Sequence, residues 1–284
     1  MSRVFANPLT ELAEFEQLQE CLKKKKGPVQ VSGCLDSQKV HLMYWLGKDG
    51  GFPWKLVVTY DDQRAREIYD DFRSFTENVW LYPAKDLLFY SADIHGNLLT
   101  RERLQVLRHL MEDENGVVVT TMDGLMDHLL PPRCMQEQVL HLETGQELDL
   151  EAWKLRLTEL GYERMPQVDG MGQFSVRGGI LDIYPLTEEL PVRIELWDTE
   201  VDSIRTFDLE SQRSIEQLDE IDIYPATEIV LTKKQAREGI ERIRSEAKAF
   251  AEKLRAQQNT EEAYRISGIV KELTEGIGEG WKQT

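Results

Sequence analysis

The chain has 284 residues, of which 41% are hydrophobic and 30% are charged, and its formal net charge is -17. It can bury a sizeable core but is too long for one ordinary compact domain, so we expect two or three domains. A strongly acidic surface repels phosphate backbones, which argues against a protein that holds DNA by charge alone.

The number of cysteines and the hydropathy of the sequence indicate the cellular compartment. The three cysteines, Cys21, Cys34 and Cys134, form no CxxC pair, and an odd number without a framework is typical of a reducing compartment. No stretch of the sequence has the length and apolarity of a signal segment or a bilayer span. We therefore expect a cytoplasmic protein without a membrane partner. The ending at Gly278–Thr284, after helical material, suggests a piece of a longer protein.

Residues 1–133 alternate between helical and strand patterns. Apolar spacing predicts helices over residues 9–22, 36–46, 62–75, 104–111 and 123–130, and strands over residues 29–33, 56–60, 79–82 and 117–121. Continuous apolar strands separated by helices are typical of a parallel sheet covered on both faces. The first domain is therefore predicted to be a doubly wound α/β domain.

After the Pro131–Pro132 pair the pattern changes. A helix over residues 151–160 precedes short alternating strands over residues 173–177, 180–184, 192–197 and 201–207. This pattern predicts a second, α+β domain with an antiparallel sheet over residues 134–222. Residues 223–284 form the third part, which is helical and highly charged from Lys233 to about Gly276. That part is either an arm that packs on the first domain or the start of a further domain.

The loop Ser32–Lys39 follows the first predicted strand, where an α/β NTPase would carry its phosphate loop. Such a loop needs glycine-freed backbone N–H groups, a lysine and a Ser/Thr hydroxyl for Mg²⁺. Here Gly33 is suitably placed, but no Gly-Lys-Ser/Thr follows, and Asp36 puts a negative charge where phosphates would lie. A strand–turn–helix with a capping aspartate explains the loop better than an ATP site does.

Catalytic and metal constellations are lacking in the sequence. The histidines are scattered without HxH or HExxH spacing, and no serine lies in a GxSxG context. We therefore assign neither catalytic residues nor metal ligands.

Strand alternation in the second domain predicts a polar stripe. In residues 192–197, alternation puts the aliphatic side chains on one face and Arg193, Glu195 and Trp197 on the other. Arg177 joins this stripe if the preceding hairpin is a neighbour. Exposed tryptophan and arginine dominate protein–protein hot spots. Alternatively, Trp197 is buried and the arginines pair locally with Glu195 or Asp198.

Several stretches resemble one family. Residues 172–185, GQFSVRGGILDIYP, resemble a signature shared by UvrB and the transcription-repair coupling factor (Mfd). The continuation resembles the coupling factor specifically, in PVRIELWD at 191–198, DSIRTFD at 202–208, SQRS at 211–214 and YPA at 224–226. The α/β part matches more loosely.

The resemblance implies an amino-terminal UvrB-like module made of domains 1a, 2 and part of 1b. Domain 1a (1–133) would be a degenerate helicase fold without a phosphate loop, and domain 2 (134–222) would recruit UvrA. The family's UvrA contact uses two arginines and an aromatic residue that correspond to Arg177, Arg193 and Trp197. The aromatic residue is more usually phenylalanine, so Trp197 is a departure that keeps a large apolar surface.

Three hypotheses about function follow. The first is a non-catalytic module that recruits UvrA in transcription-coupled nucleotide excision repair and has no cofactor of its own. RNA polymerase, DNA and ATP would then bind to downstream domains, where the translocating motor lies. The second is an active nucleotide-dependent UvrB-type helicase subunit of the excision nuclease, and the third is an α/β metabolic enzyme. The first also predicts that alanine at Arg177 or Arg193 weakens UvrA binding and leaves stability unchanged.

Overall fold

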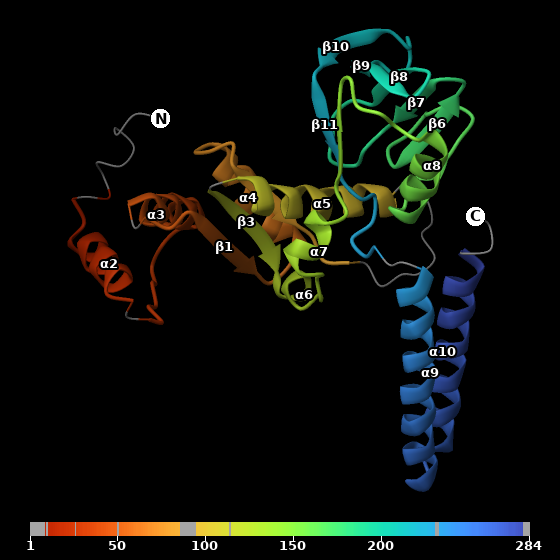
Figure 1. Ribbon diagram of the computed structural model, residues 1–284. Helices are drawn as coiled ribbons and strands as arrows, with labels where there is room; N and C mark the ends of the chain where they lie inside the picture. The colour runs from red at the N-terminus through yellow and green to blue at the C-terminus, as the bar shows by residue number, and fades with distance from the viewer. Residues whose placement is uncertain are drawn as a thin grey trace. The chain divides into compact units, whose positions relative to one another are not determined.

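The computed structural model describes residues 9, 11–25, 27–49, 51–85, 95–113, 115–230 and 233–280 (Figure 1). The chain divides into two compact units. The first contains residues 1–139 and 184–191, and the second contains residues 140–183 and 192–284.

A parallel three-stranded sheet forms the centre of the first unit. Its strands are β1 (Trp54–Thr59), β2 (Val79–Tyr82) and β3 (Gly116–Thr121), in the order β1-β3-β2. The central strand β3 is buried along its whole length, as its run of valines predicts.

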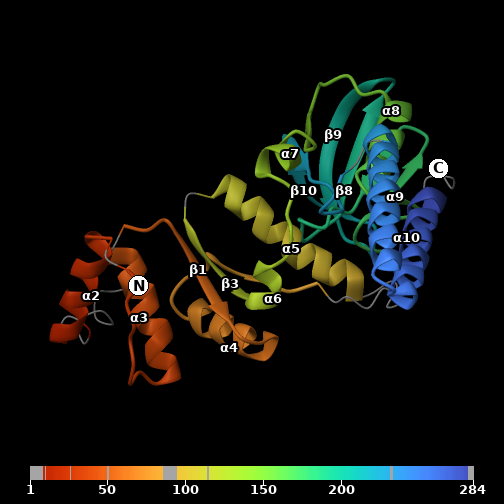
Figure 2. The same ribbon diagram turned by 90° about the horizontal axis from the view of Figure 1, so that it is seen from below.

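Helices cover both faces of this sheet, as Figure 2 shows for α4 and α5. Val117 and Val119 of β3 pack in one cluster with residues of α3 (Asp36–Asp49) and α4 (Asp62–Arg73). Val118, which points the other way, packs with Val106 of α5 (His95–Glu112). Asp61 caps α4, because its side chain accepts a hydrogen bond from the backbone N–H of Arg64.

One predicted strand of the first unit is wrong. Residues 29–33 form no strand; Val29 and Val31 are exposed. Two valines alternating with Gln30 and Ser32 offer too little apolar surface to hold a fourth strand in the sheet. The other helices that the structure describes in this unit are α2 (Ala13–Lys23), α6 (Met122–Leu125) and α7 (Pro132–Gln136).

An antiparallel sheet forms the centre of the second unit. Its strand order is β10-β9-β8-β7-β6-β5, and only the β5–β6 pair is parallel. The strands are β5 (Glu163–Arg164), β6 (Gln173–Arg177), β7 (Ile180–Ile183), β8 (Val192–Trp197), β9 (Glu200–Phe207) and β10 (Ser214–Leu218). A separate antiparallel pair joins β4 (Leu140–Glu143) to β11 (Glu220–Ile223).

The aliphatic face of this sheet forms the core of the second unit. Phe174, Leu181 and Ile194, from three neighbouring strands, are fully buried in one cluster with residues of α8 (Leu150–Glu159) and of the β4–β11 pair. Because residues two apart in a strand share a face, the opposite face of the sheet carries the polar side chains.

The last described part is a helical hairpin of α9 (Lys233–Ala256) and α10 (Thr260–Gly280), which lie side by side in both views (Figures 1 and 2). Ala251 and Ala263 are buried in it, whereas Tyr264 is exposed. No helix among the described residues is long and apolar enough to span a membrane. The predicted α/β class is confirmed: a parallel sheet, an antiparallel sheet and a helical segment occur in chain order.

Candidate functional site

The polar face of the antiparallel sheet carries charged side chains across its four central strands. The pairing register places Ser175 opposite Asp182, Asp182 opposite Arg193, and Arg193 opposite Arg205. Because directly opposed residues share a face, these four side chains form one row across β6, β7, β8 and β9.

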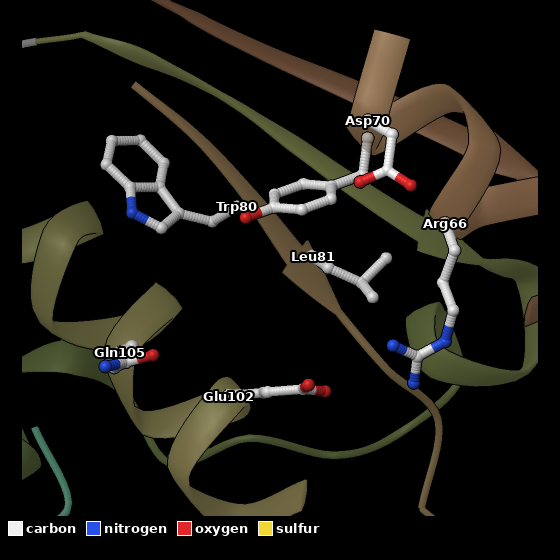
Figure 3. A pocket seen from close by; sticks show the side chains of 7 residues that line it. Arg66, Asp70, Trp80, Leu81, Glu102 and Gln105 are labelled. Atoms are coloured by element: carbon white, nitrogen blue, oxygen red, sulfur yellow. The ribbon is translucent and has the colours of Figure 1, made fainter. Parts of the chain in front are cut away.

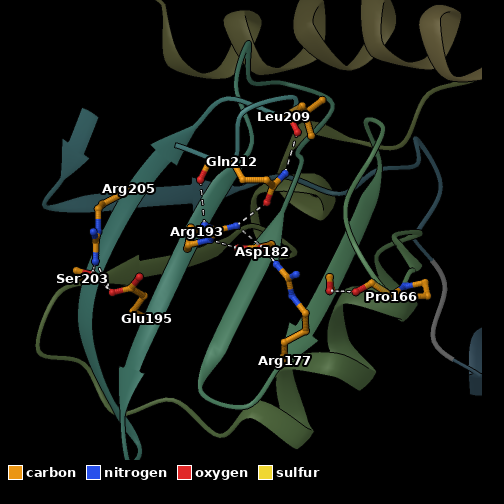
Figure 4. A network of polar contacts seen from close by, with 10 residues as sticks. Pro166, Arg177, Asp182, Arg193, Glu195, Ser203, Arg205, Leu209 and Gln212 are labelled. Atoms are coloured by element: carbon orange, nitrogen blue, oxygen red, sulfur yellow. Dashed lines mark hydrogen bonds and ion pairs between the residues drawn. The ribbon is translucent and has the colours of Figure 1, made fainter. Parts of the chain in front are cut away.

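Asp182 is the centre of this row (Figure 4). Its side chain is 1% exposed, and its Oδ1 accepts a hydrogen bond from Nε of Arg193 at 2.7 Å. Its Oδ2 accepts one from Nη2 of Arg193 at 3.0 Å and one from Nη2 of Arg177 at 2.8 Å. A buried carboxylate is stable only when it is paired and hydrogen-bonded, and the two guanidinium groups satisfy both needs.

All three nitrogens of the Arg193 guanidinium group donate hydrogen bonds. Beyond Asp182, its Nη2 donates to Oε1 of Gln212 at 2.9 Å and its Nη1 donates to the backbone oxygen of Gln212 at 3.4 Å. The group also lies 4.4 Å from the ring centre of Phe207, and the side chain is only 15% exposed. The hydrogen bond to Asp182 raises the pKa of Arg193 above its ordinary value.

Arg177 and Trp197 are more accessible than Arg193. The Arg177 side chain is 45% exposed, although its Nη2 is anchored to Asp182. Trp197 ends β8, pairs with Glu200 across the following turn and is 81% exposed. A tryptophan exposed to this degree leaves most of its apolar surface in water.

A second ion pair lies on the same face. Nη2 of Arg205 donates to Oε2 of Glu195 and also to Oγ of Ser203 at 3.0 Å. Glu195 is therefore neutralised by Arg205, and it does not pair with Arg193 or Arg177.

Comparisons with known proteins show what the domain that carries this face is similar to. Residues 140–229 match the family described as the UvrB interaction domain. The chain is 37% identical over 224 residues to the transcription-repair-coupling factor of Bacillus subtilis, which is 78% of this chain and 19% of that protein. It is 34% identical over 236 residues to that of Staphylococcus epidermidis, which is 82% of this chain and 20% of that protein.

The resemblance to the transcription-repair coupling factor is confirmed. The chain is similar to the amino-terminal UvrB-like module of that factor and spans about a fifth of the length of the curated relatives it matches. Arg177, Arg193 and Trp197 all fall inside residues 140–229, which match the UvrB interaction domain.

The predicted stripe is present, but its exposure is uneven. Arg193, Glu195 and Trp197 share one face of the UvrB interaction domain with Arg177, as strand parity predicts. The expectation that all of them are exposed is wrong for Arg193, because Asp182 and Gln212 enclose its guanidinium group. The expectation of unchanged stability therefore applies to Arg177 and not to Arg193.

The alternative of a buried Trp197, with the arginines paired to Glu195 or Asp198, is also wrong. The two arginines pair with Asp182, which the sequence analysis did not single out, rather than with Glu195 or Asp198. A signal for Asp182 exists in the sequence, since it is an acidic residue within a short aliphatic strand, where alternation points it to the polar face. Gln212 carries no such signal, because its contact depends on how a loop folds over the sheet.

Residues 33–39, where a phosphate loop would lie, comprise a short segment before α3 and the first turn of that helix. Asp36 is the first residue of α3, and its Oδ1 lies 2.9 Å from Nζ of Lys39 and 3.1 Å from Nη2 of Arg64. The hydrogen bond from Lys39, followed by the charge of Arg64, holds the pKa of Asp36 below its ordinary value. The Asp36 carboxylate thus already pairs with both of these cations. The neighbouring cavity, of about 370 Å³, is lined largely by aliphatic side chains of α3 and β1.

We expect that titrating ATP into this chain releases no binding heat up to millimolar ATP. Gly33 alone does not supply the run of free N–H groups that cradles phosphates, and Asp36 repels them. Isothermal titration calorimetry checks this expectation, with Asp36→Ala as a companion variant that should also fail to bind. A saturable ATP signal that Asp36→Ala strengthens would show that a working nucleotide site survives here.

A smaller pocket of about 190 Å³ lies between α4, β2 and α5 (Figure 3). Its lining combines Tyr69 and Trp80 with three charged side chains, Arg66, Asp70 and Glu102. Within the described part of the chain, no group of three or more histidine, cysteine or acidic side chains is arranged to hold a metal ion.

Proposed function

We propose that this chain binds UvrA through the polar face of its UvrB interaction domain, with Arg177, Arg193 and Trp197 as the binding residues. The observation that carries the proposal is the exposed Trp197 on the same face as two arginines that one buried aspartate holds in place. Tryptophan and arginine are the residue types most often found at the energetic centre of an interface.

The charge of this face indicates what the partner surface carries. Arg177 exposes part of its guanidinium group, and arginine presents a planar fork that suits a carboxylate. Trp197 adds a wide apolar contact at small entropic cost, since it has few rotatable bonds. A partner surface with a carboxylate beside an apolar patch therefore matches this face.

We also propose a role for this chain in DNA repair. The chain would act as a non-catalytic module, without a cofactor of its own, that recruits UvrA to stalled polymerase during transcription-coupled nucleotide excision repair. Polymerase and DNA binding, and ATP-driven translocation, would belong to other parts of the whole protein. The similarity to transcription-repair-coupling factors and the UvrB interaction domain support this role.

Binding of the purified chain to purified UvrA, measured by isothermal titration calorimetry, tests the proposal. Arg177→Ala should weaken binding by roughly 5- to 150-fold, the effect of about 1–3 kcal/mol when an interface loses a charged hydrogen bond. Arg265→Ala removes an exposed arginine on α10 and serves as the matched control. If the wild-type chain does not bind, or Arg177→Ala and Arg265→Ala bind alike, the face is not the contact.

A further inference from the structure

The loop between β9 and β10 is fastened mainly by its own hydrogen bonds. Oδ1 of Asp208 accepts two hydrogen bonds from Ser211, one from the backbone N–H at 2.8 Å and one from the side-chain Oγ at 2.7 Å. These hydrogen bonds hold the pKa of Asp208 below its ordinary value. The backbone N–H of Gln212 donates to the backbone oxygen of Asp208 at 2.8 Å. These hydrogen bonds within the loop therefore fix the position of the Gln212 backbone.

Gln212 is the residue through which this loop reaches the polar face (Figure 4). Its backbone is left-handed, with φ of 58°, a conformation that non-glycine residues rarely adopt. Its Nε2 donates to the backbone oxygen of Leu209 at 2.8 Å, which leaves Oε1 directed at Nη2 of Arg193. The side chain therefore bridges the loop and the guanidinium group.

The two acceptors of Arg193 differ in strength. Asp182 accepts hydrogen bonds from Nε and Nη2 of the guanidinium group with a charged, buried carboxylate, while Gln212 accepts one from Nη2 with a neutral amide oxygen. The donor is charged in both cases, but only the carboxylate adds the attraction between two opposite full charges. A carboxylate that arrives from outside can therefore replace Gln212, and it cannot replace Asp182.

We propose that Gln212 is a specificity-determining residue, an internal stand-in for a partner carboxylate that displaces it from Arg193 on binding. The proposal rests on the proposed function and extends it, because it names the chemical group that Arg193 receives. In the free chain Gln212 competes with the partner for Arg193. A partner that offers only a neutral acceptor gains little over Gln212 and is therefore rejected.

Three variants at one position test the competition, each titrated with purified UvrA. Gln212→Ala and Gln212→Gly remove the competing amide oxygen and keep only the longer contact from Arg193 to the backbone oxygen of residue 212. Both should tighten binding by about 2- to 10-fold, the free-energy equivalent of one ordinary hydrogen bond. The glycine variant covers the case in which alanine is strained at this positive φ. Gln212→Glu places a permanent carboxylate on Arg193 and should weaken binding by at least a similar factor.

Gln257→Ala, which removes an exposed glutamine from the turn between α9 and α10, is the matched control and should bind like the wild type. If the alanine and glycine variants bind UvrA with unchanged or lower affinity, Gln212 supports the contact or lies outside it, and the inference fails while the proposed function stands. If the wild-type chain does not bind UvrA, the proposed function and this inference fail together.

Discussion

Replacing Asp182 with alanine is expected to lower the free energy of unfolding by roughly 3 kcal/mol, the typical cost of breaking a buried ion pair. The variant leaves Arg193, whose side chain is only 15% exposed, without a charged partner. Arg177 contributes less to this cost, because it is 45% exposed and can turn into water. Urea denaturation of the wild type and the variant measures the difference.

Two further variants show whether the loss comes from the buried network. Asp182→Asn keeps an oxygen acceptor and nearly the same shape, so its loss should be smaller than that of Asp182→Ala. Asp202→Ala removes an exposed aspartate from β9 and should stay within about 0.5 kcal/mol of the wild type. A change of that small size for Asp182→Ala would mean that the arginines do not depend on this carboxylate.

Trp197→Ala is expected to weaken UvrA binding by about 30-fold or more, which corresponds to the 2 kcal/mol loss that marks an interface hot spot. The free energy of unfolding should hardly change, because the side chain is 81% exposed and packs little against the fold. Calorimetric titration gives the affinity, and urea denaturation of the same preparations gives the stability.

Trp197→Phe distinguishes an aromatic contact from a structural effect. Phenylalanine keeps a large apolar ring, so this variant should retain most of the affinity. Tyr264→Ala removes an equally exposed aromatic residue from α10 and should bind like the wild type. Equal affinities for Trp197→Ala and Tyr264→Ala would exclude Trp197 from the interface.

The sequence predicted the elements whose patterns are local and strong. The valine run of β3 and the alternation of β8 gave the bounds of both strands closely. The short strand β10 was missed, because nearly all of its residues are exposed and its pattern lacks buried alternation. The strand expected over residues 29–33 was a false prediction, because its residues have an alternating pattern but do not pair with the sheet.

For the candidate site, strand parity predicted which face of the sheet each side chain occupies, but not its contacts. Alternation correctly placed Arg177, Arg193 and Trp197 on one face, because parity depends only on position along a strand. Parity does not show which strands are neighbours, so the pairing of Asp182 with both arginines was missed. It also does not show that a distant loop brings Gln212 over Arg193, which is why that arginine was expected to be exposed.

The central claim is that UvrA binds the polar face of β6–β9, and side-chain footprinting with hydroxyl radicals tests it most directly. Oxidation of each aromatic side chain is compared by mass spectrometry in the free chain and in its mixture with UvrA. We predict that oxidation of Trp197, which is 81% exposed in the free chain, falls strongly in the mixture, while oxidation of Tyr264 stays unchanged. Strong protection of residues elsewhere, with Trp197 still oxidised as in the free chain, would contradict the account.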